Sequence, residues 1–343
     1  MIDSIKISVV IPTYNPPVER FIACIKSILN QNFDEYEIIV YDDGSDSEVA
    51  DSIARISEMD SRIRLLRGRH AGVSQARNQA TLLARGTYVI YADSDDEVPS
   101  YTLARVWELA EKTDADVIMG MTQYIKSDAE KKECSDGVIT YYTGEEITKL
   151  VDYHLIGRLK GLPTTNAYGA VIKVGPVARA VRRSLAVDTP FPEGIPISED
   201  TIWNIELLIK TNMAVIVGDT WYWYWVINDS SSHSYRENAY QEATKIIQKL
   251  ILLWRENNSV IKPESMLARV IGEINRLIKK NHARSECTLT FREKSQQIDR
   301  LVSIAEDAGL SSASVASKGG IRELVKYLLI KTKIIEIIVS IIC

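Results

Sequence analysis

Short runs of β-branched residues alternate with amphipathic stretches over the first 120 residues of the chain. The runs have the length of buried strands, and the stretches between them repeat apolar residues at helical intervals. Strands are predicted at 7–12, 37–41, 63–66, 88–92 and 116–120, and helices at 21–29, 49–56, 73–84 and 101–112. This alternation is typical of βαβ units. The expected fold class is α/β, with a mostly parallel central sheet flanked by helices.

The pattern changes near residue 239, beyond which apolar residues recur only at helical spacing. Helices are predicted at 240–254, 263–283, 291–308 and 321–343. We therefore expect an α/β domain at 1–238 and a helical region at 239–343. Charged residues interrupt the last helix too often for it to cross a membrane. It can pack on the rest of the protein, pair with a second subunit in a homo-oligomer, or lie on an anionic membrane surface.

The segment from about 121 to 196 shows a weaker pattern, and residues 126–136 are predicted to form a polar loop. Further on, residues 221–225 read Trp-Tyr-Trp-Tyr-Trp. Alternating aromatic residues predict an edge strand packed against the core. Stacking of a sugar on one exposed ring is the second interpretation.

Composition narrows the class of protein. The 343 residues carry 41 basic and 46 acidic side chains, dispersed along the chain, for a formal net charge of −5. No nucleic-acid partner is therefore expected. The four cysteines are far apart in the sequence, which argues against a disulfide framework and against a zinc site. The amino-terminal residues lack the pattern of a secretory signal, so a cytoplasmic location is expected.

Polar sequence follows four of the predicted strands, at 12–15, 42–45, 67–72 and 93–96. Ligands of open α/β sheets bind in the crevice at the carboxyl ends of strands, so these segments should converge there. The last segment is Asp93-Ser94-Asp95-Asp96. Three carboxylates in four residues require a compensating cation or exposure to water. A D-x-D turn of this kind can hold a divalent metal that bridges diphosphate oxygens.

The turn at 13–17 carries neither a dinucleotide fingerprint nor a phosphate-binding glycine loop. The turn Asp42-Asp43-Gly44 instead offers a carboxylate that can accept hydrogen bonds from a base imide or from ribose hydroxyls. Two alternatives to a transferase remain open: a non-catalytic nucleotide- or glycan-binding module, and a nucleotidyltransferase. The second would require a glycine-rich, basic phosphate loop after the first strand.

Six segments resemble the motifs of family 2 glycosyltransferases with the GT-A fold, a Rossmann-like α/β fold. The segments follow the order of that family over roughly the first 235 residues: 12–15, 27–31, 37–45, 72–78, 84–88 and 93–96. The resemblance implies a bacterial enzyme that builds a surface polysaccharide. It also implies a nucleotide-sugar donor, expected to be a UDP-sugar, and a glycan or lipid-linked saccharide acceptor. Relatives that work on lipid carriers favour a peripheral position on the inner face of the cell membrane.

The same resemblance assigns roles on the donor side. It implies that Thr13 and Asp43 contact the base, that Asp93 contacts the ribose, and that Asp95 ligates Mn²⁺ or Mg²⁺. Arg77, together with Asn78, is expected to shape the donor site. The remaining donor-site residues implied by the motifs are Pro12, Tyr14 and Ser94.

On the acceptor side, Ile197-Ser198-Glu199-Asp200 precedes an apolar helix predicted at 202–209. Ser198 would make a good N-cap and the two acids suit a first helical turn, so a structural explanation is complete by itself. By resemblance to the family, Asp200 is the general base of an inverting transfer, and Glu199 orients the acceptor. Direct displacement with inversion needs no covalent intermediate.

A serine-rich loop at 229–234 contains His233, where the family often closes a loop over the diphosphate. His233 is a candidate ligand of the metal or the phosphate, and Arg236 is a weaker candidate. A solvated histidine is the alternative interpretation.

Overall fold

The computed structural model describes residues 5–156, 165–166, 169–226 and 235–310. The chain divides into two compact units, one formed by Met1–Leu150 with Leu159–Ile227 and the other by Val151–Arg158 with Asn228–Cys343. Among the described residues, no helix is both long and apolar enough to cross a membrane. The predicted helix at 321–343 lies outside the described residues.

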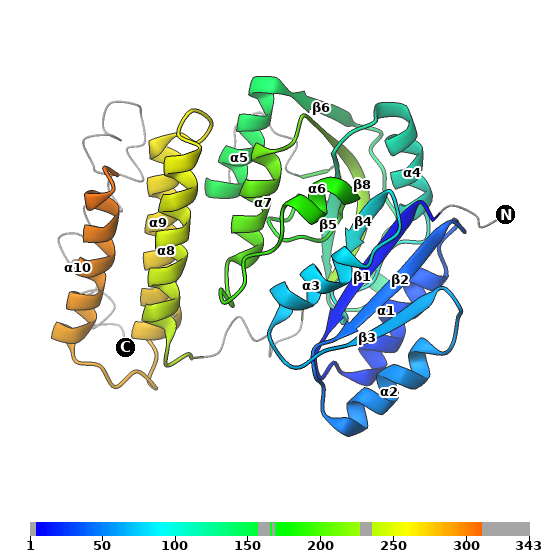
Figure 1. The fold of residues 1–343 in the computed structure, drawn as a ribbon, viewed down its shortest axis with the longest axis horizontal. Helices are drawn as coiled ribbons and strands as arrows, with labels where there is room; N and C mark the ends of the chain where they lie inside the picture. Colours follow the sequence, from blue (N-terminus) through cyan, green and yellow to red (C-terminus); the bar gives the residue numbers. More distant parts are fainter. Residues whose placement is uncertain (1–4, 157–164, 167–168, 227–234, 311–343) are drawn as a thin grey trace. The chain divides into compact units, whose positions relative to one another are not determined.

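The first unit is built on one eight-stranded sheet, whose strand order is β3-β2-β1-β4-β7-β5-β8-β6 (Figure 1). The strands are β1 (Ile7–Thr13), β2 (Tyr36–Asp42), β3 (Ile63–Arg67), β4 (Tyr88–Tyr91), β5 (Val117–Ile125), β6 (Ile139–Thr143), β7 (Arg179–Arg182) and β8 (Met213–Trp225). The strands β3, β2, β1 and β4 run parallel, as the βαβ pattern predicts. The strands β5 and β8 are also parallel, whereas β7 and β6 are antiparallel to their neighbours.

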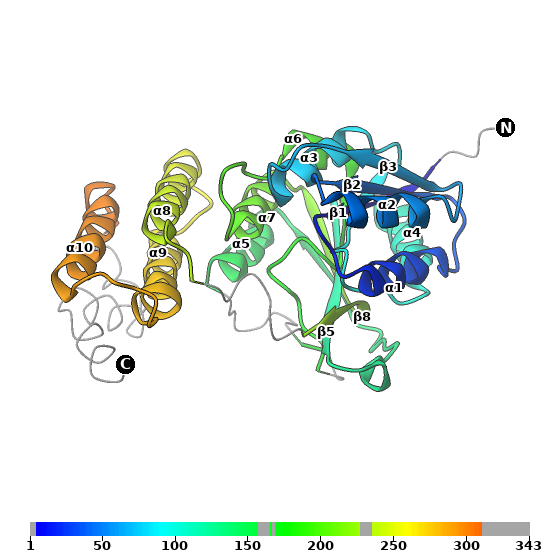
Figure 2. The ribbon, with the colours of Figure 1, turned by 90° about the horizontal axis from the view of Figure 1, so that it is seen from below.

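Helices cover both faces of this sheet. They are α1 (Val18–Leu29), α2 (Ser47–Ser57), α3 (Val73–Leu82), α4 (Thr102–Thr113), α6 (Arg183–Asp188) and α7 (Glu199–Ile209). The helix α5 (Ile147–Ile156) begins in this unit and continues into the second one. One core cluster joins Val9 and Ile11 of β1 to Ile25 of α1 and Val106 of α4. Figure 2 shows α3 and α6 on the opposite face from α1. The α/β class with a GT-A-like sheet and helical flanks is confirmed.

The region with the weaker sequence pattern, from about 121 to 196, contributes two strands that the pattern did not reveal. Residues 179–182 form β7, which inserts between β4 and β5, and residues 139–143 form the edge strand β6. Both are short and pair with residues distant in sequence, so no local repeat announces them. Residues 126–136 hold only a short 3₁₀ turn, Asp128–Glu130, in agreement with the predicted loop.

The aromatic run at 221–225 forms the end of β8. Trp221 and Tyr222 are each only 1% exposed, which confirms core packing as the main role of the run. The expected edge position is wrong, because β8 lies between β5 and β6 in the sheet. Along this stretch β8 pairs with β5 on one side, and on the other side Trp223 forms an isolated bridge with Glu97. The aromatic strand therefore reaches the acidic turn, which follows β4.

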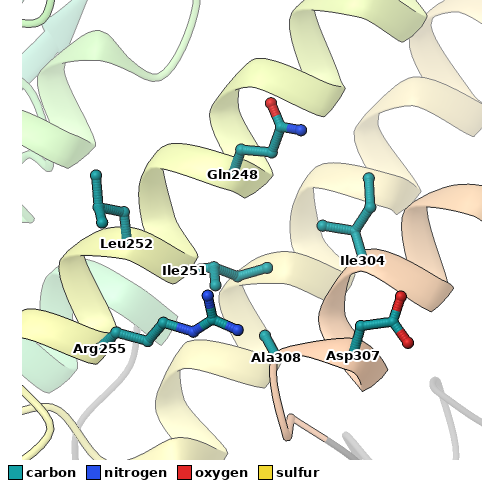
Figure 3. Close-up of a pocket in the computed structure, with 7 residues that line it drawn as sticks. All are labelled: Gln248, Ile251, Leu252, Arg255, Ile304, Asp307 and Ala308. Carbon is teal, nitrogen blue, oxygen red and sulfur yellow. The ribbon is translucent and has the colours of Figure 1, made fainter.

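The described part of the second unit contains three long helices, α8 (Ala239–Glu256), α9 (Pro263–Leu277) and α10 (Phe291–Asp307). The sequence predicted one helix over 263–283, but α9 ends at Leu277 and a π-helical turn, Ile278–His282, follows it. A shallow hollow opens between α8 and α10 (Figure 3). It is lined by Gln248, Ile251, Leu252, Arg255, Ile304, Asp307 and Ala308.

Candidate active site

The carboxyl ends of three adjacent strands carry the predicted donor residues. Thr13 ends β1, Asp43 follows β2 and Asp93 follows β4, and these strands lie in the order β2-β1-β4. The backbone N–H of Asp43 donates to the carbonyl of Thr13 at 2.8 Å, which joins the first two loops. Pro12 lies in β1 opposite Tyr41 of β2, and Ser94 lies in the turn after Asp93. The predicted convergence of these loops is therefore present in the fold.

The Asp43 carboxylate is held in place by the loop before α3. It accepts hydrogen bonds from the backbone N–H groups of Ala71 at 2.9 Å and Gly72 at 2.8 Å. The Nδ1 atom of His70 lies 3.0 Å from the same carboxylate. Gly72 has a φ of 97°, a conformation that glycine adopts without strain. The sequence therefore builds a rigid acidic edge at this end of the crevice.

Tyr14 and His70 form an aromatic pair beside Asp43. Their ring centroids are 4.0 Å apart with an interplanar angle of 23°, and Tyr14 is 47% exposed. The buried Oγ1 of Thr13 has no hydrogen-bond partner among the described residues. A buried hydroxyl without a partner is costly, so it marks a place where a ligand can bond. His70 was not predicted individually, although its loop was among the polar strand ends.

The acidic turn is tied to the fold by two arginines. Arg77 of α3 donates from Nη2 to Asp93 Oδ1 at 2.9 Å. Arg20 of α1 donates from Nη2 to the Asp95 carbonyl oxygen at 2.7 Å. Asp96 is buried and accepts a hydrogen bond from the Trp225 backbone N–H at 2.8 Å. Burial, together with the negative charges of Asp93 and Asp95, raises the pKa of Asp96 to about 8.

The turn fits a divalent cation in charge and in donor type. Burial and the charge of Asp93 raise the pKa of Asp95, and a bound cation would relieve that repulsion. Carboxylate oxygens are the ligands that Mg²⁺ and Mn²⁺ prefer. The described residues contain no group of three or more potential ligands. Asp93 and Asp95 would thus hold the ion, with water and diphosphate oxygens completing its coordination.

The start of α7 brings the predicted base to this turn. Arg77 donates from Nη1 to Glu199 Oε1 at 3.4 Å, so one buried guanidinium touches both Asp93 and Glu199. Burial raises the pKa of Glu199 to about 7, with the negative charge of Asp200 as the second cause. The Asp200 carboxylate accepts a hydrogen bond from the backbone N–H of Thr201 at 2.6 Å.

The expected capping role of Ser198 is wrong. Its φ is 65°, and its side chain makes no capping hydrogen bond to the helix. A capping serine has extended backbone angles, which this left-handed conformation excludes.

Asn78, expected to shape the donor site, bonds through its amide to the backbone of Phe191, with distances of 2.7 and 2.9 Å.

A lysine for which the sequence predicted no individual role lies among the same acids. The Nζ atom of Lys173 is 3.4 Å from the centroid of the Tyr224 ring. Burial lowers the pKa of Lys173, while the charges of Asp93, Asp96 and Asp200 act in the opposite direction. The residue belongs to a segment without a strong pattern, so only its position in the fold reveals it.

His233 and Arg236 were predicted as ligands of the metal or the phosphate. His233 lies outside the described residues. Arg236 forms an ion pair with Glu242 at 2.9 Å inside the second unit.

Comparisons with known proteins find glycosyltransferases among the relatives of this chain. Residues 8–166 match the profile described as Glycosyl transferase family 2. The chain is 27% identical over 222 residues to glycosyltransferase GlyG of Streptococcus pneumoniae, a match that covers 64% of this chain and 70% of the relative. It is 24% identical over 253 residues to poly(ribitol-phosphate) beta-glucosyltransferase of Bacillus spizizenii. That match covers 71% of this chain but only 37% of the relative.

A solved structure shares the fold. The structure of S. aureus TarS 1-349 in complex with UDP-GlcNAc is similar with a TM-score of 0.64 and 17% sequence identity. The similarity covers 96% of this chain and 92% of that one. The sequence match, the GT-A-like sheet and the acids gathered at its strand ends agree with one another. These findings agree that the chain is a glycosyltransferase whose residues 8–166 resemble glycosyl transferase family 2.

Proposed function

We propose that this glycosyltransferase is an inverting, metal-dependent enzyme that uses a UDP-sugar. The acceptor is a glycan or a lipid-linked saccharide of the bacterial cell surface. The UDP-GlcNAc bound to the related TarS supports a uridine donor. The Bacillus spizizenii relative, named for action on poly(ribitol-phosphate), supports a cell-surface polymer as the acceptor class.

One observation carries this proposal: Arg77 joins the acidic turn to the start of α7. Its guanidinium contacts Asp93 at 2.9 Å and Glu199 at 3.4 Å. Donor-binding acids and the candidate base therefore share one crevice, as a transfer between two substrates requires. Arg77 is buried, which fixes the relative position of the two acidic segments.

In the proposed reaction Asp200 accepts the proton of the acceptor hydroxyl. The hydroxyl oxygen then forms a bond to the anomeric carbon, while the bond from that carbon to the diphosphate oxygen breaks on the opposite face. Glu199 orients the acceptor. On the donor side Asp43, Thr13 and Tyr14 bind the base. A divalent ion on Asp95 and Asp93 would supply charge stabilisation for the leaving diphosphate.

Calorimetric titration of UDP, GDP and dTDP, each with Mn²⁺ and with EDTA, tests the donor assignment. We expect UDP to bind, and to bind more tightly with Mn²⁺. The variant Asp95→Ala should abolish the effect of Mn²⁺ and leave weak UDP binding. Binding of GDP or dTDP instead of UDP would refute the uridine assignment, and equal affinity with and without metal would refute the metal site.

The cellular setting belongs to the same proposal. We place the enzyme in the cytoplasm, at the inner face of the membrane, with the segment 321–343 as the contact, and we retain a domain boundary near residue 239. Flotation with vesicles containing anionic lipid, compared between the full chain and a chain ending at 310, tests the contact. Equal flotation of both chains would remove it. Light scattering tests the proposed homo-oligomer.

A further inference from the structure

One basic side chain of the site, Lys173, forms no ion pair with a described residue. Arg77 is shared by Asp93 and Glu199, and Arg20 lies 3.6 Å from Glu97 while it bonds the Asp95 carbonyl. Lys173, by contrast, forms no ion pair with any described residue. Of these three cations it is the one free to meet a new anion.

The aromatic strand holds the ammonium group of Lys173 at the acidic turn. Its Nζ lies 3.4 Å from the centroid of the Tyr224 ring, a cation–π contact. Tyr224 belongs to β8, whose next residue, Trp225, bonds the Asp96 carboxylate. A lysine on a four-carbon stem can leave such a ring and reach a ligand without any movement of the backbone.

A buried polar pair fixes the backbone at Lys173 and at Asp200 together. Arg179, 2% exposed, donates from Nη2 to the Lys173 carbonyl oxygen at 2.7 Å and from Nη1 to Asn204 Oδ1. The amide of Asn204 donates to the carbonyl oxygens of Val174 and Asp200, both at 2.8 Å. The Arg179–Asn204 pair therefore fixes the backbone of Lys173 relative to that of Asp200.

We propose that Lys173 binds the diphosphate of the nucleotide sugar, and that the Arg179–Asn204 pair positions it. This inference rests on the proposed use of a nucleotide diphosphate. Negatively charged carboxylates of the site, such as Asp93 and Asp200, would repel that group, so a second cation beside the metal has a clear electrostatic purpose. As the sugar departs, negative charge grows on the diphosphate, and the ammonium group stabilises it there.

Binding of uridine and of UDP, compared between variants, tests this assignment. The variants are Lys173→Met, which keeps the length of the side chain without its charge, and Lys173→Arg, which keeps the charge. Lys112→Met is the matched control, because Lys112 pairs with Glu108 on the exposed side of α4. Affinities are measured by calorimetry for UDP and by ligand-observed NMR for uridine, with Mn²⁺ and with EDTA.

We expect Lys173→Met to weaken UDP binding by about 10- to 100-fold, since a hydrogen bond to a charged group is lost. Uridine binding should stay within twofold of the wild type, Lys173→Arg should recover most of the loss, and Lys112→Met should change neither ligand. Unchanged UDP binding, or an equal loss for uridine and UDP, would overturn the assignment to the diphosphate. A wild-type protein that binds neither ligand would instead refute the proposed function itself.

Discussion

The carboxylates of the candidate site have opposite environments in its two parts, the nucleobase end around Asp43 and the acidic turn at 93–96. At the nucleobase end, Asp43 receives two backbone hydrogen bonds and a histidine contact, so its negative charge is well solvated by the protein. At the acidic turn, the Oδ2 atom of Asp96 is buried with no partner among the described residues. Nearby charges and burial raise the pKa values of Asp95, Asp96 and Glu199.

This difference teaches which part of the site is already complete. At the nucleobase end, the hydrogen bonds of the Asp43 carboxylate are already in place, so this part offers a preorganised surface to the nucleobase. The acidic end retains electrostatic repulsion that a cation or an acceptor can relieve on binding. Affinity for the base should depend on shape, whereas affinity for the diphosphate should depend on charge.

The largest expected effect is at the candidate general base, Asp200. Asp200→Asn should lower kcat by about 10²- to 10⁴-fold, because the acceptor proton loses its acceptor, while UDP affinity stays near that of the wild type. Steady-state kinetics of sugar transfer, or of donor hydrolysis where no acceptor is available, measure it. Asp51→Asn, on the exposed side of α2, is the control. A kcat within threefold of the wild type would remove Asp200 from the mechanism.

Arg77→Met should come next, because it leaves two carboxylates without their shared counter-charge. Removing one partner of a buried ion pair costs about 3–5 kcal/mol, and the partial exposure of Asp93 places this case near 3 kcal/mol. Urea denaturation measures the free energy of unfolding. Arg77→Lys should lose less, and Arg55→Met, on an exposed face of α2, should change little. A loss below 1 kcal/mol for Arg77→Met would show that the two acidic segments hold together without it.

Asp96→Asn sharpens the comparison through its dependence on pH. The folded pKa of Asp96, about 8, exceeds the usual value of about 3.9, so between these pH values the folded protein keeps a proton that the unfolded chain releases. The free energy of unfolding of the wild type therefore falls as pH rises through this window. The variant lacks this slope and should gain about 4 kcal/mol on the wild type between pH 5 and pH 9, because about 1.4 kcal/mol is lost for each pH unit up to the folded pKa.

Thermal melting of both proteins in EDTA at pH 5, 7 and 9 measures that difference. The same comparison for Asp43→Asn should show no gain at high pH, because this carboxylate is satisfied by backbone N–H groups. A constant difference between Asp96→Asn and the wild type at all three pH values would contradict the account.

The smallest effect is expected at the aromatic pair. Tyr14→Ala should weaken UDP binding by about fivefold, equivalent to about 1 kcal/mol of ring stacking. Tyr14→Phe keeps the ring and should bind UDP as the wild type does. Calorimetry measures both. Identical weakening by Ala and Phe would point to the hydroxyl group rather than to the ring.

The nucleobase end can be predicted from sequence because each of its parts is local. Thr13 ends β1 and Asp43 directly follows β2, strands that belong to successive βα units, and a parallel sheet brings the ends of such strands together. The family motifs also lie in these loops. The positions of these strands and helices, and the convergence of the loops, therefore follow from the amino-acid sequence alone.

The acidic end could not be predicted in full, because its parts come together through long-range contacts. The four residues of β7 insert between β4 and β5 from about 60 residues further along the chain, and Arg179 within β7 holds the backbone of Lys173. No periodicity marks so short a strand. Ser198 misled for a local reason, since its residue type suits a cap but its φ of 65° does not.

In the proposed mechanism, the guanidinium shared by Asp93 and Glu199 makes the binding of donor and acceptor thermodynamically dependent on each other. A ligand that neutralises either carboxylate releases Arg77 to the other, which changes the affinity for the second substrate. Linkage requires the same factor in both directions, so an acceptor that tightens donor binding must itself bind more tightly to the loaded enzyme. Transfer would then proceed with a preferred order of substrate binding, set by a single buried side chain.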